Sequence, residues 1–163
     1  MQTNEKTLPR VRINNLKAQG YTAFSDCEIT EFAWGNRFAS ILSGITLLIG
    51  LLTTSISTLI ALNIIIAGGL LLPNSPFDYI YNFLLSNVLN KPKIPPRSKQ
   101  AKFSLLIAFL WLNSTIALFY FEYTLFGYIM GGMLLSVSAL VSTTDFCIPA
   151  VIYNLLYKIK IKK

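Results

Sequence analysis

The sequence contains no histidine, only seven acidic residues and only two cysteines among its 163 residues. Without histidine it lacks the commonest metal ligand and the usual base near neutral pH. We therefore expect no metal, no cofactor and no hydrolytic active site, and these absences favour a non-enzymatic role. Two cysteines are also too few for a small secreted fold held together by several disulfide bonds.

Charged residues are scarce and segregated. They make up 13% of the chain, against roughly 25% in soluble proteins, while hydrophobic residues make up 53%. Residues 38–73 contain no charged side chain, and residues 103–144 contain only Glu122. Both runs exceed the roughly 18 apolar residues that indicate a membrane-spanning helix. The sequence therefore predicts an all-α integral membrane protein with the lipid bilayer as its main partner.

Each of these runs is too long for one span, because a bilayer core needs about 20 helical residues. Breaks at residues 52–55 and 120–123 predict four transmembrane helices that form two hairpins. The expected helices cover residues 37–52, 55–72, 103–121 and 124–142. The expected division of the chain is a polar head (1–36), the first hairpin (37–72), an interfacial helix with a basic loop (73–102), the second hairpin (103–144), and an interfacial helix with a basic tail (145–163).

The segment between the hairpins has the pattern of an amphipathic helix on the membrane surface. Ser75 is a favoured N-cap, Pro76 suits the first helical position, and Asp78 places an acid in the first turn. Apolar residues then recur at helical spacing, at Phe77, Ile80, Tyr81, Leu84, Leu85 and Val88. The helix is too short to cross a bilayer but suits its interface. A second such helix is expected over residues 150–160, and the head is expected to be loosely structured before Ser25 and helical from there.

The basic residues predict the orientation. The formal net charge is +7, and lysines and arginines collect in the head, the central loop and the tail, whereas the two hairpin turns contain none. The tail lysines are Lys158, Lys160, Lys162 and Lys163. Because basic loops stay in the cytoplasm, we expect a multi-pass protein of the bacterial cytoplasmic (inner) membrane with both termini cytoplasmic. Topology explains the charge, so no nucleic-acid partner is expected.

The two halves of the chain resemble each other. Arg-Phe at 37–38 opens the first predicted helix and Lys-Phe at 102–103 opens the third. Ile-Tyr-Asn occurs at 80–82 and again at 152–154. Both halves would enter the membrane from the same side, so a duplication would be a parallel internal repeat with its pseudo-twofold axis along the membrane normal. Convergence of two similar hairpins is the alternative.

The predicted spans carry few polar residues. Asn63 and Asn113 lie near the middles of two helices, where they could hydrogen-bond across the bundle. Gly127 and Gly131 allow close helix packing, and we favour packing within one chain over a homodimer. No acidic or basic residue lies deep in a span, which argues against ion-coupled transport. A passive small-solute carrier, with a polar path along the asparagines and serines, is one alternative function.

Cys147 and Cys27 are the two candidate redox thiols. Cys147 lies shortly before Pro149, near the start of the last short helix, where a thiol can be acidified, although Asp145 works against this. Cys27 lies in the head, on the same predicted side of the membrane. The alternative, which residue type alone favours, is that a partly buried cysteine is simply a small hydrophobic residue.

Four short motifs occur in a distinctive order: Cys27 in the head, Asn-Arg at 36–37, Pro-Phe-Asp at 76–78 and Phe-Cys at 146–147. In this order, over about residues 27–157, the chain resembles the bacterial membrane family called domain of unknown function 4395. The family's last motif often has a second cysteine three residues after the first, and here that position is Ala150. The resemblance implies a link to thiol or sulfur chemistry, with a cytoplasmic thioredoxin-like or sulfurtransferase protein as a partner, but no established activity.

The matching positions fall at the cytoplasmic ends of the predicted helices, and we expect a polar cluster there. Its residues are Asn36, Arg37, Asp78 and Asp145. We expect Arg37 to pair with Asp78, either to lock the interfacial helix to the bundle or to form a site beside Cys147. The leading functional interpretation is a scaffold, an anchor or an accessory subunit of a larger membrane complex. The alternative is a thiol-redox or sulfur-relay component that uses Cys147, with or without Cys27.

Overall fold

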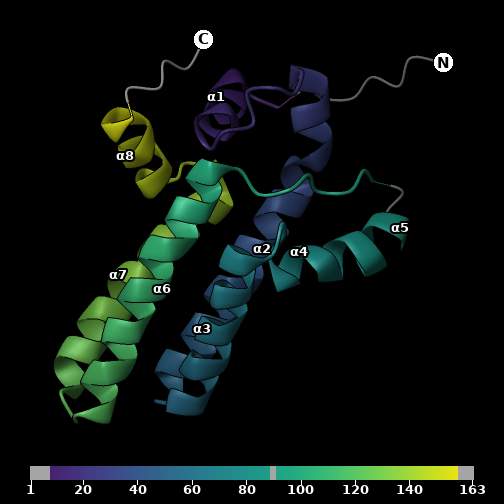
Figure 1. Cartoon of the computed structure of the whole chain (residues 1–163). Helices are drawn as coiled ribbons and strands as arrows, with labels where there is room; N and C mark the ends of the chain where they lie inside the picture. Colours follow the sequence, from purple (N-terminus) through teal and green to yellow (C-terminus); the bar gives the residue numbers. More distant parts are fainter. Residues whose placement is uncertain (1–7, 89–90, 158–163) are drawn as a thin grey trace.

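The computed structural model describes residues 8–88 and 91–157, and all regular structure in these residues is helical (Figure 1). The elements are α1 (Arg10–Ala18), α2 (Asp26–Leu52), α3 (Ile56–Leu71), α4 (Pro76–Ile80), the π-helical segment η1 (Tyr81–Leu85), α5 (Ser86–Val88), α6 (Lys99–Tyr120), α7 (Thr124–Thr144) and α8 (Ile148–Leu156). The predicted all-α class is confirmed. The tail lysines and the end of the helix expected over 150–160 lie outside the described residues, and these lysines are Lys158, Lys160, Lys162 and Lys163.

Four helices, α2, α3, α6 and α7, pack together in a bundle (Figure 1). Its core residues come mainly from three of them and include Leu47, Leu51, Leu59, Leu62, Ile66, Leu112 and Phe119. α1 and α8 lie at one end of the bundle, and the α2–α3 and α6–α7 turns lie at the other (Figure 1). Among the described helices, α2, α6 and α7 are long and apolar enough to cross a membrane. α3 has 16 residues and forms a bent pair with the segment 76–88, at 82°.

The chain reverses direction where the sequence predicts the two breaks. Thr54, between α2 and α3, and Glu122, between α6 and α7, adopt the left-handed backbone conformation, with φ of 49° and 62°. This conformation does not continue a right-handed helix. Ser55 then caps α3, because its hydroxyl accepts a hydrogen bond from the backbone N–H of Thr58 at 3.3 Å. Both breaks are therefore confirmed as tight turns.

The head is more ordered than the sequence predicts. α2 begins at Asp26 because Ser25 and Glu28 form a capping box, in which the Glu28 carboxylate accepts the backbone N–H of Ser25 at 2.8 Å. The predicted helix from Ser25 is confirmed and continues without a break into the helix expected over 37–52. The expected loose structure before it is wrong, because α1 packs against α2 in a small apolar core. The buried members of that core are Ile13, Leu16, Tyr21, Ile29, Phe32 and Ala33.

The segment 76–88 begins as predicted, but it buries a different face. Its buried face includes Phe77, Tyr81 and Ser86, which are spaced by four and then five residues. The wider spacing arises because η1 is π-helical, and a π-helical turn holds one more residue than an α-helical turn. The single predicted stripe is therefore split, since Phe77 and Tyr81 are buried while other apolar side chains are exposed. The exposed ones include Ile80, Phe83, Leu84 and Val88.

The last short helix also leaves its apolar residues exposed. α8 begins at Ile148, before the expected residue 150, and buries Ala150 and Asn154. Leu155 and Leu156 are 78% and 66% exposed, which is the exposure expected of side chains that face lipid. The short terminal helix that the sequence predicts is therefore present within the described residues, with an apolar outer face.

One packing contact recurs in the two halves of the chain. Phe38 lies against Tyr81 with ring centroids 5.8 Å apart, and Phe103 lies against Tyr153 with ring centroids 5.4 Å apart. These are the equivalent positions of the repeated Arg/Lys-Phe and Ile-Tyr-Asn motifs. In each half, a phenylalanine of a long helix thus contacts the segment that follows the pair of long helices.

Candidate functional site

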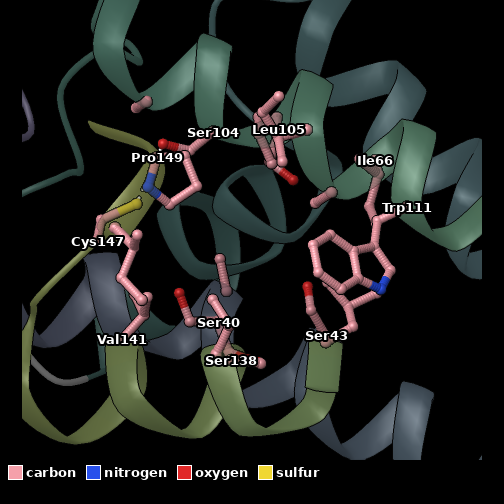
Figure 2. A pocket seen from close by; sticks show the side chains of 18 of the residues that line it. Ser40, Ser43, Ile66, Ser104, Leu105, Trp111, Ser138, Val141, Cys147 and Pro149 are labelled. Atoms are coloured by element: carbon pink, nitrogen blue, oxygen red, sulfur yellow. Dashed lines mark hydrogen bonds between the residues drawn. The ribbon is translucent and has the colours of Figure 1, made fainter. Parts of the chain in front are cut away.

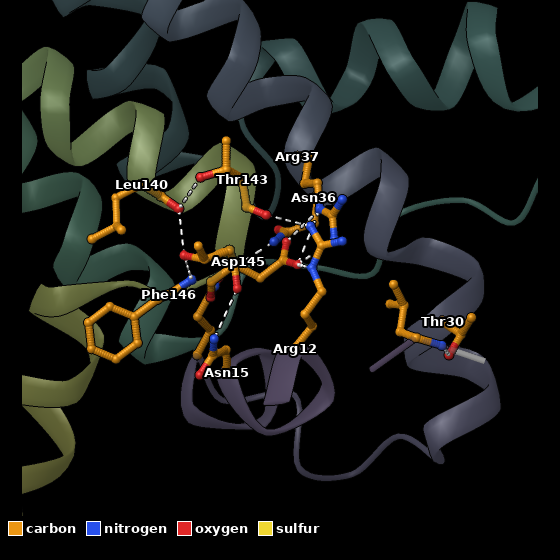
Figure 3. Close-up of polar contacts among 12 residues, drawn as sticks. Arg12, Asn15, Thr30, Asn36, Arg37, Leu140, Thr143, Asp145 and Phe146 are labelled. Atoms are coloured by element: carbon orange, nitrogen blue, oxygen red, sulfur yellow. Dashed lines mark hydrogen bonds and ion pairs between the residues drawn. The ribbon is translucent and has the colours of Figure 1, made fainter. Parts of the chain in front are cut away.

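Asp145 is the centre of a buried ion-pair network at the end of α7 (Figure 3). Its backbone is left-handed, with φ of 58°, and its side chain is 1% exposed. The carboxylate accepts hydrogen bonds from Arg37, at 2.6 Å from Nη2, and from Arg12, at 3.0 Å from Nε. Two guanidinium groups therefore share one carboxylate, which leaves one positive charge in the network. Arg12 does not belong to the predicted cluster.

The side chains of α1 also cap the C-terminal end of α7. The carbonyl oxygens of residues 143–145 accept hydrogen bonds from Arg12 at 2.7 Å, Asn15 at 2.9 Å and Gln19 at 2.7 Å (Figure 3). The last carbonyl groups of a helix have no partner within the helix, and cations favour this end of its dipole. Asn36 joins the network through a long hydrogen bond to Gln19, at 3.5 Å. α1 is therefore held to both α2 and α7.

Asp78 forms a second buried ion pair. Its side chain is fully buried and accepts two hydrogen bonds of 2.6 Å from Nε and Nη2 of Arg97, whose side chain is 9% exposed. It also accepts the backbone N–H of Ser75 at 2.9 Å. Burial opposes the charged form of Arg97, but the charge and hydrogen bonds of Asp78 outweigh it and raise the pKa of Arg97 above its usual value. The guanidinium of Arg97 therefore stays charged in its buried position.

The predicted Arg37–Asp78 pair is wrong, since Arg37 pairs with the aspartate at the end of α7 and Asp78 pairs with Arg97. The loop after α5 explains the difference. Asn82 binds both backbone groups of Ile94, accepting its N–H at 2.7 Å and donating to its carbonyl at 3.3 Å. This clamp holds the loop against η1, next to α4, where Arg97 pairs with Asp78. The predicted cluster is therefore divided between two networks.

Arg97 has a sequence signal that the prediction did not use. Within residues 91–102 it is the only arginine among four lysines. A guanidinium group suits a buried, two-point bond to a carboxylate, whereas lysine is a compact and strongly hydrated charge. A single arginine in a lysine-rich loop is therefore better explained by pairing with a buried carboxylate than by the orientation of the chain in the membrane.

A cavity of about 400 Å³ lies between α2, α3, α6, α7 and the start of α8 (Figure 2). Most of its wall is apolar, and side chains such as Leu105 and Trp111 line it. Its polar lining includes Arg97, Ser104 and Cys147, together with serines of α2 and α7. The sequence prediction did not include this cavity. It depends on the packing of five helices, although the serines on the facing helices are a weak sign of it.

The two cysteines are not brought together. Cys147 is half-buried, lines the cavity and donates a hydrogen bond to the hydroxyl of Ser104 at 3.1 Å. Cys27 is exposed in the first turn of α2. Arg37 contacts Asp145, which lies two residues before Cys147 in the chain. Cys27 lies ten residues before Arg37 in α2, which corresponds to about 15 Å along the helix axis. Both thiols are free, and a disulfide needs Cα atoms within roughly 7 Å.

Neither Asn63 nor Asn113 forms a hydrogen bond to another helix within the described residues. Asn113 is exposed and donates to the carbonyl of Phe109 in its own helix at 2.8 Å, so its predicted bond across the bundle is wrong. Asn63 is buried, and its Oδ1 has no hydrogen-bond partner in the described part of the chain. The GxxxG motif packs within the chain, because a Cβ atom on Gly131 would overlap Leu51. Within residues 8–88 and 91–157, no group of three or more His, Cys, Asp or Glu could hold a metal ion.

Comparison with known proteins gives one match. No curated protein and no solved structure matches the chain. A family model described as a domain of unknown function, number 4395, matches residues 33–158. The match extends from the first third of α2 past α8, so it includes Asp78, Asp145 and Cys147 but excludes Cys27 and Arg12. It covers most of the chain, and the protein therefore belongs to the family of domain of unknown function 4395.

Proposed function

We propose that this protein crosses the bacterial cytoplasmic membrane four times, through α2, α3, α6 and α7. α3 is short for a membrane span, because its 16 residues cover only about 24 Å, whereas the bilayer core is roughly 30 Å thick. α3 packs beside the apolar part of α2, which begins at Phe38 and is equally short. Two helices of matched length can cross where the bilayer is locally thinned.

The charges support an orientation with both termini in the cytoplasm. The turns at 53–55 and 121–123 carry no lysine or arginine, and the opposite end of the bundle carries the ion pairs and the basic loop. Basic residues are retained on the cytoplasmic side. The exposed apolar residues of segment 76–88 and of α8 would lie in the lipid interface on that side.

At the cytoplasmic face, the protein acts as a scaffold, anchor or accessory subunit of a larger membrane complex. The observation that carries this proposal is the sharing of Asp145 between Arg12 and Arg37. Together with the bonds from Asn15 and Gln19, it fixes α1 on the ends of α2 and α7. Because α1 is already held in place, binding of a second protein to it loses little further conformational entropy, and α1 is therefore a suitable docking surface.

Cysteine labelling tests the topology. In a background of Cys27→Ser and Cys147→Ser, single cysteines are introduced as Thr54→Cys, Lys93→Cys and Glu122→Cys. An impermeant maleimide should label Thr54→Cys and Glu122→Cys in intact cells, and Lys93→Cys only after lysis. Labelling of Lys93→Cys from the same side as Thr54→Cys would show that α3 does not cross the membrane.

Co-purification from native membranes tests the scaffold role. A partner should be recovered in constant ratio with the wild-type protein and lost with the double variant Arg12→Ala and Asn15→Ala, which removes the bonds of these two side chains to the end of α7. Lys17→Ala is the matched control, because Lys17 lies on the same helix and its ion pair with Asp26 is exposed. Equal recovery with all three proteins, or no partner at all, contradicts the scaffold proposal.

A second candidate is a thiol-redox or sulfur-relay role, and the position of Cys147 in the cavity wall favours it. There the thiol could attack a sulfur of a small disulfide, form a mixed disulfide and release the other half as a thiol. A thioredoxin-like or sulfurtransferase protein would be the matching cytoplasmic partner. Protein carrying Cys27→Ser should gain one glutathione from glutathione disulfide at neutral pH, and Cys147→Ser should abolish this gain. A Cys147 that reacts only after denaturation contradicts this role.

A further inference from the structure

Two hydroxyl groups that line the cavity have no hydrogen-bond partner among the described residues. Ser104 and Ser138 also line the cavity, and each donates to a backbone carbonyl, of Gln100 at 3.0 Å and of Ser40 at 3.1 Å. The hydroxyls of Ser40 and Ser43 have no such bond within the described residues, and they line the same cavity (Figure 2). A hydroxyl without a partner is costly in an apolar environment. The wall of the cavity therefore offers two groups able to bind a polar atom.

Arg97 offers a third. Its Nε and Nη2 are bonded to Asp78, while Nη1 has no partner in the part of the chain that the structure describes. The side chain is more than nine-tenths buried and lines the cavity. A guanidinium nitrogen can only donate hydrogen bonds. A group that binds here must therefore accept hydrogen bonds, and oxygen is the usual acceptor.

The remaining wall is suited to hydrocarbon. It includes Leu47, Leu62, Ile66, Leu105, Trp111 and Leu134, from all four long helices. A volume of about 400 Å³ is within the range of sites that hold small molecules, which are mostly apolar with a few placed polar groups. We infer that the cavity binds an amphipathic molecule from the lipid phase, with a hydrocarbon body between the helices and an oxygen acceptor as its head group. This inference goes beyond the scaffold role and does not depend on it.

The head group is recognised through hydrogen bonds rather than through net charge. Asp78 already compensates the charge of Arg97, so the site has no unpaired cation to attract an anion. A carboxylate and an ester carbonyl should therefore both bind. A hydrocarbon without an oxygen atom should not compete with either, because it leaves Ser40, Ser43 and Nη1 of Arg97 unbonded.

Tryptophan quenching tests the site directly. The chain has two tryptophans, Trp34 and Trp111, and Trp111 lines the cavity, so Trp34→Phe leaves a single reporter there. Bromododecanoic acid and its methyl ester, added to protein in detergent, should quench Trp111 to saturation. Bromododecane should give only the weak, unsaturable quenching of an additive dissolved in the micelle.

Two matched alanines on α6 provide the control. Ala108 lines the cavity and Ala117 is exposed, so Ala108→Phe should abolish the saturable quenching and Ala117→Phe should preserve it. Thermal unfolding of both variants shows whether they remain folded. The double variant Ser40→Ala and Ser43→Ala fills no space, and it should weaken the acid and the ester several-fold without affecting bromododecane.

Alkylation of Cys147 gives a readout independent of fluorescence. In Cys27→Ser protein, saturating dodecanoic acid should slow the reaction of Cys147 with N-ethylmaleimide several-fold, because the thiol lies in the cavity wall. Equal quenching by bromododecane and by the acid, unchanged by Ala108→Phe, would overturn the inference. Such quenching would come from additive dissolved in the detergent and not from a molecule bound in the cavity. Neither result depends on whether a partner protein co-purifies.

Discussion

The Asp78–Arg97 pair allows a quantitative test of what holds the central loop. Asp78 is fully buried and accepts three N–H groups, two from Arg97 and one from the backbone of Ser75. Arg97→Leu leaves the carboxylate with one donor and no opposite charge. Leaving one member of a buried ion pair unpaired costs roughly 3–5 kcal/mol. We expect Arg97→Leu to lower the free energy of unfolding by about that amount.

The double variant makes this prediction specific. With Asp78→Leu and Arg97→Leu together, no charge remains buried, and such replacements are often neutral or stabilising. The double variant should therefore be more stable than Arg97→Leu alone, and the two substitutions should show a coupling energy of about 2–4 kcal/mol. Unfolding in mild detergent, followed by circular dichroism against denaturant, measures the stabilities of the wild type, the two single variants and the double variant.

The exposed pair of Lys17 and Asp26 is the control, since their side chains are 22% and 62% exposed. Exposed ion pairs contribute about 0–1 kcal/mol, so Lys17→Ala should have little effect on stability. If Arg97→Leu also costs less than about 1 kcal/mol, or if the double variant is as unstable as the sum of the single ones, the reasoning is refuted.

Three further predictions concern the packing around this end of the protein and the bundle. Gly131→Ala should destabilise the fold by about 1–3 kcal/mol, because its methyl group would overlap Leu51, whereas Gly132→Ala meets nothing within 4 Å and should be neutral or slightly stabilising in thermal unfolding. Arg12→Ala should increase hydrogen exchange in α1 without unfolding the bundle, and unchanged exchange would show that the other caps suffice to hold it. Tyr21→Phe should preserve or raise the melting temperature, because the Tyr21 hydroxyl is buried with no partner in the described residues, and a clear decrease would reveal a bond that this geometry does not include.

The helices could be predicted because local signals determine their ends. Ser75, Pro76 and Asp78 mark the start of α4, and the structure adds a bond that was not predicted, from the N–H of Ser75 to Asp78. Ser25 marks the start of a helix, and the structure shows that this helix runs continuously into the first apolar helix, which the sequence predicts over residues 37–52. Sequence periodicity divides such a run at the change from polar to apolar residues. The backbone does not, since its hydrogen bonds continue through both parts.

The two ion pairs of Asp145 could not be predicted, because they join segments that are far apart in the chain. Arg12 and Asp145 are separated by 133 residues, and nothing in their local sequence connects them. The buried face of segment 76–88 was mispredicted for a different reason. A regular period of 3.6 residues was applied across η1, whose π-helical turn moves Ser86 to the inner side and leaves Val88 outside. Three-dimensional packing decides both features.

Arg97 contacts both the start of α4 and the cavity in the bundle, which the sequence patterns do not connect. Its Nε and Nη2 hold Asp78, and through it the start of α4, while the same guanidinium lines the cavity. A head group bonded to Nη1 would order a side chain that helps to hold the loop after α5 beside the start of α4. Binding in the cavity would therefore stabilise the polar surface at this end of the bundle, because both depend on the position of the Arg97 guanidinium. The converse holds by linkage, so a partner that docks on this surface and fixes the loop would raise the affinity of the cavity for its ligand.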